Sequence, residues 1–275
     1  MQTITSKLFS AVRCGIIKSN KMFWDLYADI ETIDELDLDT NDDQQYLEEN
    51  GIKIISTFEE DSLDFTSTIK RTENPFLFAY KGDINLLKDI SKNVAVVGVL
   101  TPTEDIIQRE KEIVKELVKN GKIIVSGLAK GCDTIAHRTC IENGGKTIAI
   151  LPTTVDNVYP KENKKLIDKI VASGGLVITE YVTEPKNKFE RIRRFIDRDR
   201  LQSMFSKDII LVASFRQGEG DSGSRHAMKK AKEYGRNRFV MFNEITDKNQ
   251  AIFGLNEDLI MDNVTTLTKE TIKEI

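Results

Sequence analysis

From residue 93 onward, short runs of β-branched and aliphatic residues alternate with amphipathic stretches of helical length. A hairpin cannot join two parallel strands, so a helix between consecutive strands indicates right-handed βαβ crossovers. The pattern predicts an α/β fold with a doubly wound, mostly parallel sheet. The expected strands are 94–100, 122–128, 147–151, 176–180, 208–214, 238–243 and 264–267. The expected helices between them are 104–121, 132–145, 161–175 and 224–235.

Charge is unevenly distributed along the chain. Residues 1–90 hold 9 Lys and Arg against 18 Asp and Glu, which leaves 31 against 26 for residues 91–275. The net charge of −4 is therefore a property of the amino-terminal part. Residues 185–200 hold 7 basic and 3 acidic side chains, and a guanidinium cluster on one helix face would follow a nucleic-acid backbone. The alternative is a solvated helix face on which the acids balance the arginines.

The residues before the alternation predict a separate, smaller part. Apolar side chains at helical spacing, such as Phe9, Val12 and Ile16, indicate helices, and an acidic stretch over 34–50 indicates a solvated link. We therefore divide the chain into a small helical acidic segment, residues 1–50, and an α/β domain, residues 51–275. The latter includes a short lead-in before the first predicted parallel strand.

Several classes of protein are poor matches. No stretch approaches the roughly 18 uninterrupted apolar residues of a membrane helix, and the amino terminus has no apolar signal-peptide core with a cleavage site. We expect a cytoplasmic protein that does not contact a membrane. The three cysteines form no CxxC pair and the two histidines form no zinc motif, so neither a metal nor a cofactor is expected.

One candidate anion site follows the second predicted strand of the alternation, over 126–131. Gly127 and Gly131 would allow close backbone approach, the following helix would offer its amino terminus, and Lys130 adds a positive charge. This arrangement favours a phosphate cradle that begins at Ser126. Glycines that only shape a tight turn between strand and helix would leave the same pattern.

A second candidate loop, 218–223, reads GxGxxG, with Glu244 about 20 residues further on. The dinucleotide-binding form of this motif belongs to the first βαβ unit of a sheet, whereas here it comes near the end. A loop that grips an anion is therefore favoured over a dinucleotide site.

Catalytic constellations are few. Asp133 and His137 are one helical turn apart and Ser126 is near them in sequence, so a triad is formally possible. No nucleophile elbow surrounds Ser126. We therefore favour a helix-capping role for Asp133 and a structural hydrogen bond for His137. Glu180 and Asp221 remain as isolated acids near the expected strand ends.

Motifs spread over most of residues 51–275 resemble the DNA-processing protein A family, also called DprA or Smf. Phe195, Arg198 and Arg200 match an F-P-x-R-N-R element, and Ser222 to Ser224 match an SG[ST] turn. The remaining matches are 126–133, Ala136, His137, 144–149, Asp156, Tyr159, Pro160, Glu162, Asn163, Gly174, Gly175, Thr179 and Glu180, with 74–75 and 81–83 before them and Gly254, Asn256, Leu259 and Ile260 after them.

The resemblance implies an extended Rossmann-like fold, a homodimer, binding of single-stranded DNA and loading of a RecA-type recombinase, without catalysis. It implies phosphate contacts at Lys130, Arg198 and Arg200. The full set of expected DNA- or phosphate-binding residues is Ser126, Gly127, Lys130, Gly131, Arg194, Arg198, Arg200, Ser222, Gly223 and Ser224.

The chain departs from the family pattern at several positions. Val99 and Leu100 replace the Ser-Arg of a G-S-R motif, Asp199 replaces an Asn, and the sequence ends without the winged-helix domain of many members. These departures indicate a divergent member and leave a nucleotide-binding sensor or a nucleotide hydrolase of the same superfamily as alternatives. Ala227 stands where the related hydrolases carry a Glu, which disfavours hydrolysis and leaves DNA binding as the leading hypothesis.

Overall fold

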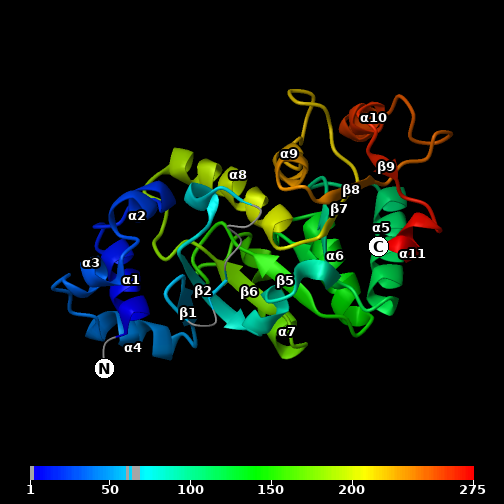
Figure 1. The fold of residues 1–275 in the computed structure, drawn as a ribbon. Helices are drawn as coiled ribbons and strands as arrows, with labels where there is room; N and C mark the ends of the chain where they lie inside the picture. The colour runs from blue at the N-terminus through cyan, green and yellow to red at the C-terminus, as the bar shows by residue number, and fades with distance from the viewer. Residues whose placement is uncertain (1–2, 60–61, 64–68) are drawn as a thin grey trace.

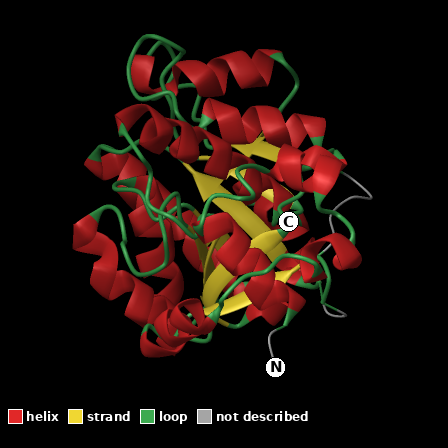
Figure 2. Cartoon of the chain, turned by 90° about the vertical axis from the view of Figure 1, so that its left-hand side faces the viewer, coloured by secondary structure: helices red, strands yellow, loops and turns green. Residues whose placement is uncertain are grey.

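We describe the protein from a computed structural model that covers residues 3–59, 62–63 and 69–275. One nine-stranded sheet crosses the molecule, with helices on both of its faces (Figure 1, Figure 2). The strands are β1 (Lys53–Ser56), β2 (Leu77–Gly82), β3 (Asn93–Val97), β4 (Ile123–Ser126), β5 (Thr147–Ile150), β6 (Leu176–Thr179), β7 (Asp208–Leu211), β8 (Asn237–Val240) and β9 (Thr265–Thr266). The α-helices are α1 (Ile4–Arg13), α2 (Asn20–Leu26), α3 (Ile30–Asp34), α4 (Asn41–Glu49), α5 (Glu104–Lys119), α6 (Cys132–Glu142), α7 (Lys164–Ala172), α8 (Lys188–Met204), α9 (Arg225–Glu233), α10 (Gly254–Met261) and α11 (Thr271–Glu274).

The strand order is β1-β2-β6-β5-β4-β3-β7-β8-β9, and all pairings from β6 to β9 are parallel. The predicted α/β class and the mostly parallel, doubly wound sheet are thus confirmed. The segment expected as a short lead-in differs from that expectation. Its strands β1 and β2 join the main sheet as antiparallel strands. Strand β2 bonds to β6 and is covered on both faces, which explains its continuous apolar sequence.

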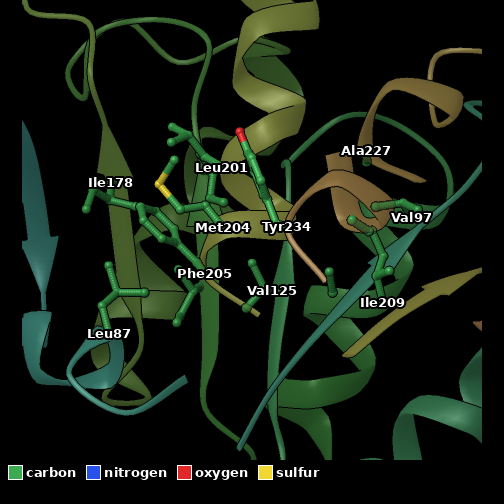
Figure 3. Close-up of a cluster of buried hydrophobic side chains, with 14 of the residues drawn as sticks. Leu87, Val97, Val125, Ile178, Leu201, Met204, Phe205, Ile209, Ala227 and Tyr234 are labelled. Carbon is green, nitrogen blue, oxygen red and sulfur yellow. The ribbon is translucent and has the colours of Figure 1, made fainter. Parts of the chain in front are cut away.

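The alternation of side chains along β3 shows how the two faces are covered. Val94 and Val96 belong to an apolar cluster with residues of α5 and α6, whereas Ala95 and Val97 belong to a cluster with residues of α8 and α9. Figure 3 shows part of the second cluster, in which Leu201 of α8 lies among side chains of the sheet. Helix α8 is therefore anchored to the sheet by its carboxyl-terminal half.

The amino-terminal helices α1 to α4 lie at the opposite end of the molecule from α10 and α11 (Figure 1). They share one apolar cluster with Leu77 and Ala79 of β2. The acidic stretch expected as a solvated link is instead largely helical, because α4 buries Leu47 in this cluster and leaves its acids outside. Whether residues 1–50 form a separate unit remains a prediction.

Strand β3 is the point at which the winding of the sheet changes direction. The chain proceeds from β3 through β4 and β5 to β6 on one side and returns on the other side with β7 and β8. Loops that leave the carboxyl ends of β3 and β7 therefore diverge and open a crevice between them. Among the described residues, no helix combines the length and the apolar character needed to cross a membrane.

Candidate nucleic-acid interface

A cavity of about 610 Å³ lies at this crevice. Its lining comes from α8 on one side and from the loops after β3, β4, β5 and β7 on the other. A cavity of this size is in the range that holds small organic ligands. Among the described residues, no group of three or more His, Cys, Asp or Glu side chains is placed to hold a metal ion.

Helix α8 supplies the largest share of the wall. Asn187 caps its amino terminus by accepting a hydrogen bond from the Glu190 backbone N–H at 2.9 Å. One face of the helix then presents side chains at a spacing of three or four residues to the cavity. Phe195 lies edge-on to Tyr159, with ring centroids 5.6 Å apart, and forms an apolar part of the wall.

The floor is centred on Arg198, whose side chain is only 5% exposed. Its Nη1 atom lies 1.1 Å from the point where a Cβ on Gly127 would stand, so the guanidinium occupies space that only glycine leaves free. The nearest carboxylates are Asp133, 3.7 Å from Nη1, and Asp199, 3.6 Å from Nε. Both separations exceed hydrogen-bond length, and neither Nε nor Nη1 has a hydrogen bond among the described residues.

Among the titratable groups of the floor, Asp199 has the pKa that burial shifts most clearly. Loss of hydration raises the pKa of Asp199 to about 7, although the neighbouring Arg198 acts in the opposite direction. Gln202, three residues later on the same helix, donates a hydrogen bond from Nε2 to Asp199 Oδ1 at 3.0 Å. The charge of the floor therefore changes near neutral pH.

The predicted phosphate cradle after β4 is placed only partly at the cavity. Ser126 is buried and donates to the Val96 carbonyl at 2.7 Å, so its hydroxyl serves the sheet. Gly131 adopts a φ of +69°, and a Cβ there would stand 2.4 Å from the Val99 carbonyl oxygen. Lys130 lines the cavity, with its side chain 62% exposed and an ion pair to Glu162 at 2.9 Å.

The loop between β7 and α9 closes the other side of the crevice. Gly223 and Ser224 line the cavity, and Ser224 donates to the Gly98 carbonyl at 3.2 Å. Asp221 accepts from the Leu100 backbone N–H at 2.6 Å, which ties the same two loops together a second time. Ser222 is buried and accepts from Arg225, so it acts within the loop.

Two of the predicted arginines of α8 do not line the cavity. Arg194 donates to the Thr183 carbonyl at 2.5 Å and to Glu190 at 2.8 Å, and its guanidinium lies over the ring of Tyr181. Arg200 makes a two-pronged contact with Glu180, at 2.6 and 2.5 Å. Both guanidinium groups are thus already paired inside the protein.

The structure does not assemble a catalytic triad. His137 is fully buried and its Nδ1 lies 2.7 Å from the Thr147 hydroxyl, while burial lowers its pKa to about 3. Asp133 accepts from the Ala129 backbone N–H at 3.1 Å, in the turn that leads into α6. The structural hydrogen bond predicted for His137 agrees with its contact. The helix-capping role predicted for Asp133 is wrong, because α6 begins after Gly131 without a side-chain cap and Asp133, its second residue, holds the preceding turn instead. Glu180 is paired with Arg200.

Some cavity residues were not singled out from the sequence. Gln202, Ile192 and Ile196 line the cavity but belong to no anion-binding motif. The signal that could have identified them is helical spacing, because they share a face of α8 with Phe195 and Asp199.

Comparison with known proteins gives consistent results. The family model "DNA recombination-mediator protein A" matches residues 53–274. The DNA processing protein DprA of Streptococcus pneumoniae is 37% identical over 174 residues, which are 63% of this chain and 57% of that protein. Protein Smf of Borreliella burgdorferi is 37% identical over 153 residues, 55% of this chain and 47% of that protein. The chain thus spans about half the length of the curated relatives it matches.

Two solved structures extend the likeness to the fold. The X-ray structure of DNA processing protein A from Streptococcus pneumoniae aligns with a TM-score of 0.70 and 27% identity, over 98% of this chain and 92% of that one. A structure of DNA processing protein A from Helicobacter pylori, described for its single-stranded DNA binding mode, aligns with a TM-score of 0.65 and 27% identity, over 81% of this chain and 94% of that one. The expected extended Rossmann-like fold is confirmed by these alignments.

Proposed function

Because the chain belongs to the DNA recombination-mediator protein A family, we propose that it binds single-stranded DNA at the cavity beside α8 and acts in DNA processing and recombination. The Helicobacter pylori relative, of similar fold, is described as binding single-stranded DNA. The proposal transfers that property to this chain, on the support of the cavity described above.

The observation that carries the proposal is the distribution of charge around the cavity. Lys130, Lys188, Arg191 and Arg225 line it from three separate segments of the chain, although the whole protein carries a net charge of −4. Cations gathered around one opening of an acidic protein would attract a polyanion to that opening. The aromatic pair of Tyr159 and Phe195 adds faces on which bases can stack.

The predicted binding residues divide into two groups under this proposal. Lys130, Arg198, Gly223 and Ser224 line the cavity and would contact DNA directly. The other predicted residues would shape the loops and hold α8 in place, and they are Ser126, Gly127, Gly131, Arg194, Arg200 and Ser222. Direct phosphate contacts from Arg194 or Arg200 would require their internal pairs to open.

We extend the proposal to the assembly and its partner. The sequence resemblance implies a homodimer that delivers single-stranded DNA to a RecA-type recombinase in the cytoplasm, without chemical turnover of its own, and the family's description as a recombination mediator supports the role in recombination. Light scattering should give a mass about twice the 31.2 kDa of one chain. A monomer at tens of micromolar would contradict the dimer, and release of free base from a nucleotide would contradict a role in binding alone.

A titration with a labelled oligothymidylate of about 20 nucleotides tests DNA binding directly. The parent should bind with an affinity that falls steeply as salt rises from about 50 to about 200 mM. Replacing both Lys188 and Arg191 by Ala should reduce the slope of log K against log salt by about 0.7 for each phosphate that the variant no longer neutralises. Lys165→Ala, an exposed lysine of α7, is the matched control. Absence of binding by the parent, or an equal slope in parent and double variant, would contradict the proposal.

A further inference from the structure

The outward face of α8 carries an apolar stripe, although surface helices normally turn polar side chains to solvent. Phe189 is 85% exposed, Ile192 49% and Ile196 42%, and their spacing of three and four residues places them on one face. With about 3.6 residues per turn, this face lies opposite Arg194 and Leu201, which are buried against the rest of the molecule. Adjoining exposed apolar side chains of this kind are typical of a binding surface.

The stripe is continuous with the cavity. Ile192 and Ile196 line the cavity, and Phe189 lies one turn before Ile192, toward the amino end of α8. Phe189 also precedes Phe195 by six residues, which corresponds to about 9 Å along the helix axis. Stacked nucleotides of one strand follow one another at about 3.4 Å, so a few nucleotides span the distance between the two rings.

Charge and size favour a nucleic-acid strand over a second protein on this stripe. Lys188 and Arg191 are exposed on one flank, and Arg193 on the other flank pairs with Asp197 at 3.3 Å but stays 81% exposed. Each partner in a standard protein interface buries roughly 800 Å², which is more than three partly exposed side chains supply. A single strand needs less, because one exposed ring holds one base while nearby cations hold its phosphates.

We propose that Phe189 is an outer stacking platform for a nucleotide that flanks the cavity, so that the bound strand leaves the cavity over the outward face of α8. The ring of Phe189 takes the face of one base, and Lys188 lies next to it in the chain for the adjoining phosphate. Stacking does not read the edges of a base, so the platform accepts every base. This inference rests on the proposed DNA binding at the cavity and adds a residue to its path.

Oligothymidylate titrations separate the platform from DNA binding itself. Phe189→Ala should weaken binding of a strand of about 20 nucleotides about tenfold and leave the slope of log K against log salt unchanged, because stacking releases no counterions. Phe189→Leu stays apolar but has no ring, so it should lose a similar amount of affinity, whereas Phe189→Trp should bind at least as tightly as the parent. Ile245→Ala removes a 94% exposed apolar side chain outside α8 and is the matched control.

Fluorescence of Phe189→Trp gives a second readout. The parent has a single tryptophan, Trp24, so the added indole accounts for the difference in emission between variant and parent. We expect the oligothymidylate to quench this added emission, because a stacked base contacts the indole ring directly. Added emission that does not respond to saturating strand would overturn the platform.

The outcomes distinguish this inference from the proposed function. Parent-like affinity in Phe189→Ala, or in Phe189→Leu, would overturn the stacking platform and leave DNA binding at the cavity intact. Failure of the parent to bind any strand would overturn DNA binding and the platform with it. If Phe189→Ala binds DNA as the parent does but gives a smaller mass in light scattering, the stripe is instead a contact between copies of the chain.

Discussion

Arg198 and Arg200 lie two residues apart on α8 and are both largely buried, yet their surroundings differ. Arg200 makes two hydrogen bonds to Glu180 and others to the Asp197 and Glu73 carbonyls, and Glu73 in turn pairs with Lys230 and Tyr234. Within the part of the chain that the structure describes, Arg198 has two long ion pairs and no shorter one. Burial alone therefore does not separate these two arginines. The number of their hydrogen-bonded donors does.

The largest expected effect is on stability, at Arg200, the arginine whose guanidinium is hydrogen-bonded inside the protein. Arg200→Ala should lower the free energy of unfolding by about 3–5 kcal/mol, because Glu180 would be left buried and without its partner. Urea denaturation measures the change. Arg193→Ala removes an 81% exposed arginine of the same helix and should alter stability by no more than about 0.5 kcal/mol. A small effect of Arg200→Ala would show that its network is not structural and would restore it as a candidate for phosphate contact.

The second effect concerns the space that Gly127 leaves for Arg198. In Gly127→Ala the new methyl group would collide with Nη1, so the guanidinium must move away from its place in the floor. We expect DNA affinity to fall about tenfold, with a stability cost of about 1–3 kcal/mol from the added volume. Titration and thermal unfolding measure the two effects separately.

A double-mutant cycle tests whether Gly127 affects DNA binding through the position of Arg198. If Gly127 acts through Arg198, then Arg198→Met should weaken binding to a similar extent, and the two changes together should cost clearly less than their sum. Strict additivity would mean that Gly127 and Arg198 contribute independently, so that DNA binding would not depend on the room that the glycine leaves for the guanidinium.

The third effect is a pH dependence set by Asp199. Its pKa is raised to about 7, so the folded state holds this proton more tightly than the unfolded state does. The protonated Asp199 carboxyl therefore adds to the free energy of unfolding. This contribution is fully present below about pH 4 and is lost as pH rises through about 7. His137, whose pKa is lowered to about 3, contributes a slope of opposite sign between about pH 3 and about pH 6.5, so parent and variant must be compared at each pH.

Asp199→Asn removes the ionisation and should make the protein more stable than the parent above about pH 7, with the difference shrinking toward about pH 4. Its affinity for oligothymidylate should exceed that of the parent above the same pH, since a negative charge beside Arg198 is gone. Denaturation curves at several pH values measure the first effect. A difference in stability that does not change with pH would contradict the assignment of the titration to Asp199.

The smallest effect is at the exposed end of the site. Lys130→Ala should lower the salt slope of DNA binding by about 0.7 and leave stability unchanged, because its pair with Glu162 is exposed on both sides. Glu162→Gln is the matched control, because it removes the acid that competes with DNA for Lys130. This substitution should strengthen binding slightly. No response to either substitution would exclude Lys130 from the DNA path.

The sequence predicted the fold better than the site, for physical reasons. The alternation of strands and helices after residue 93 is a local pattern, and each predicted strand from 94–100 to 264–267 coincides with part of an observed one. The antiparallel addition of β1 and β2 escaped prediction because strand direction and partner depend on contacts between distant segments.

The same limit applies to the arginines of α8. The sequence selected Arg194, Arg198 and Arg200 alike, the first from the basic run over 185–200 and the other two also from the motif match. Only the tertiary structure shows that Thr183 and Glu180 satisfy the first and the third. The cavity residues Gln202 and Ile196 were overlooked because they lack a motif, although helical spacing places them beside Phe195.

The outer strands of the sheet bear on how two copies of the chain could associate. At one edge stands β1, with four residues, and at the other β9, with two. Unpaired backbone groups on an edge strand are what another chain would join to continue a sheet, and short edge strands offer few of them. Side-by-side extension of the sheet is thus poorly supported at either end. A homodimer of this protein should accordingly form through side chains on helices and loops, with interface residues that substitution can reach.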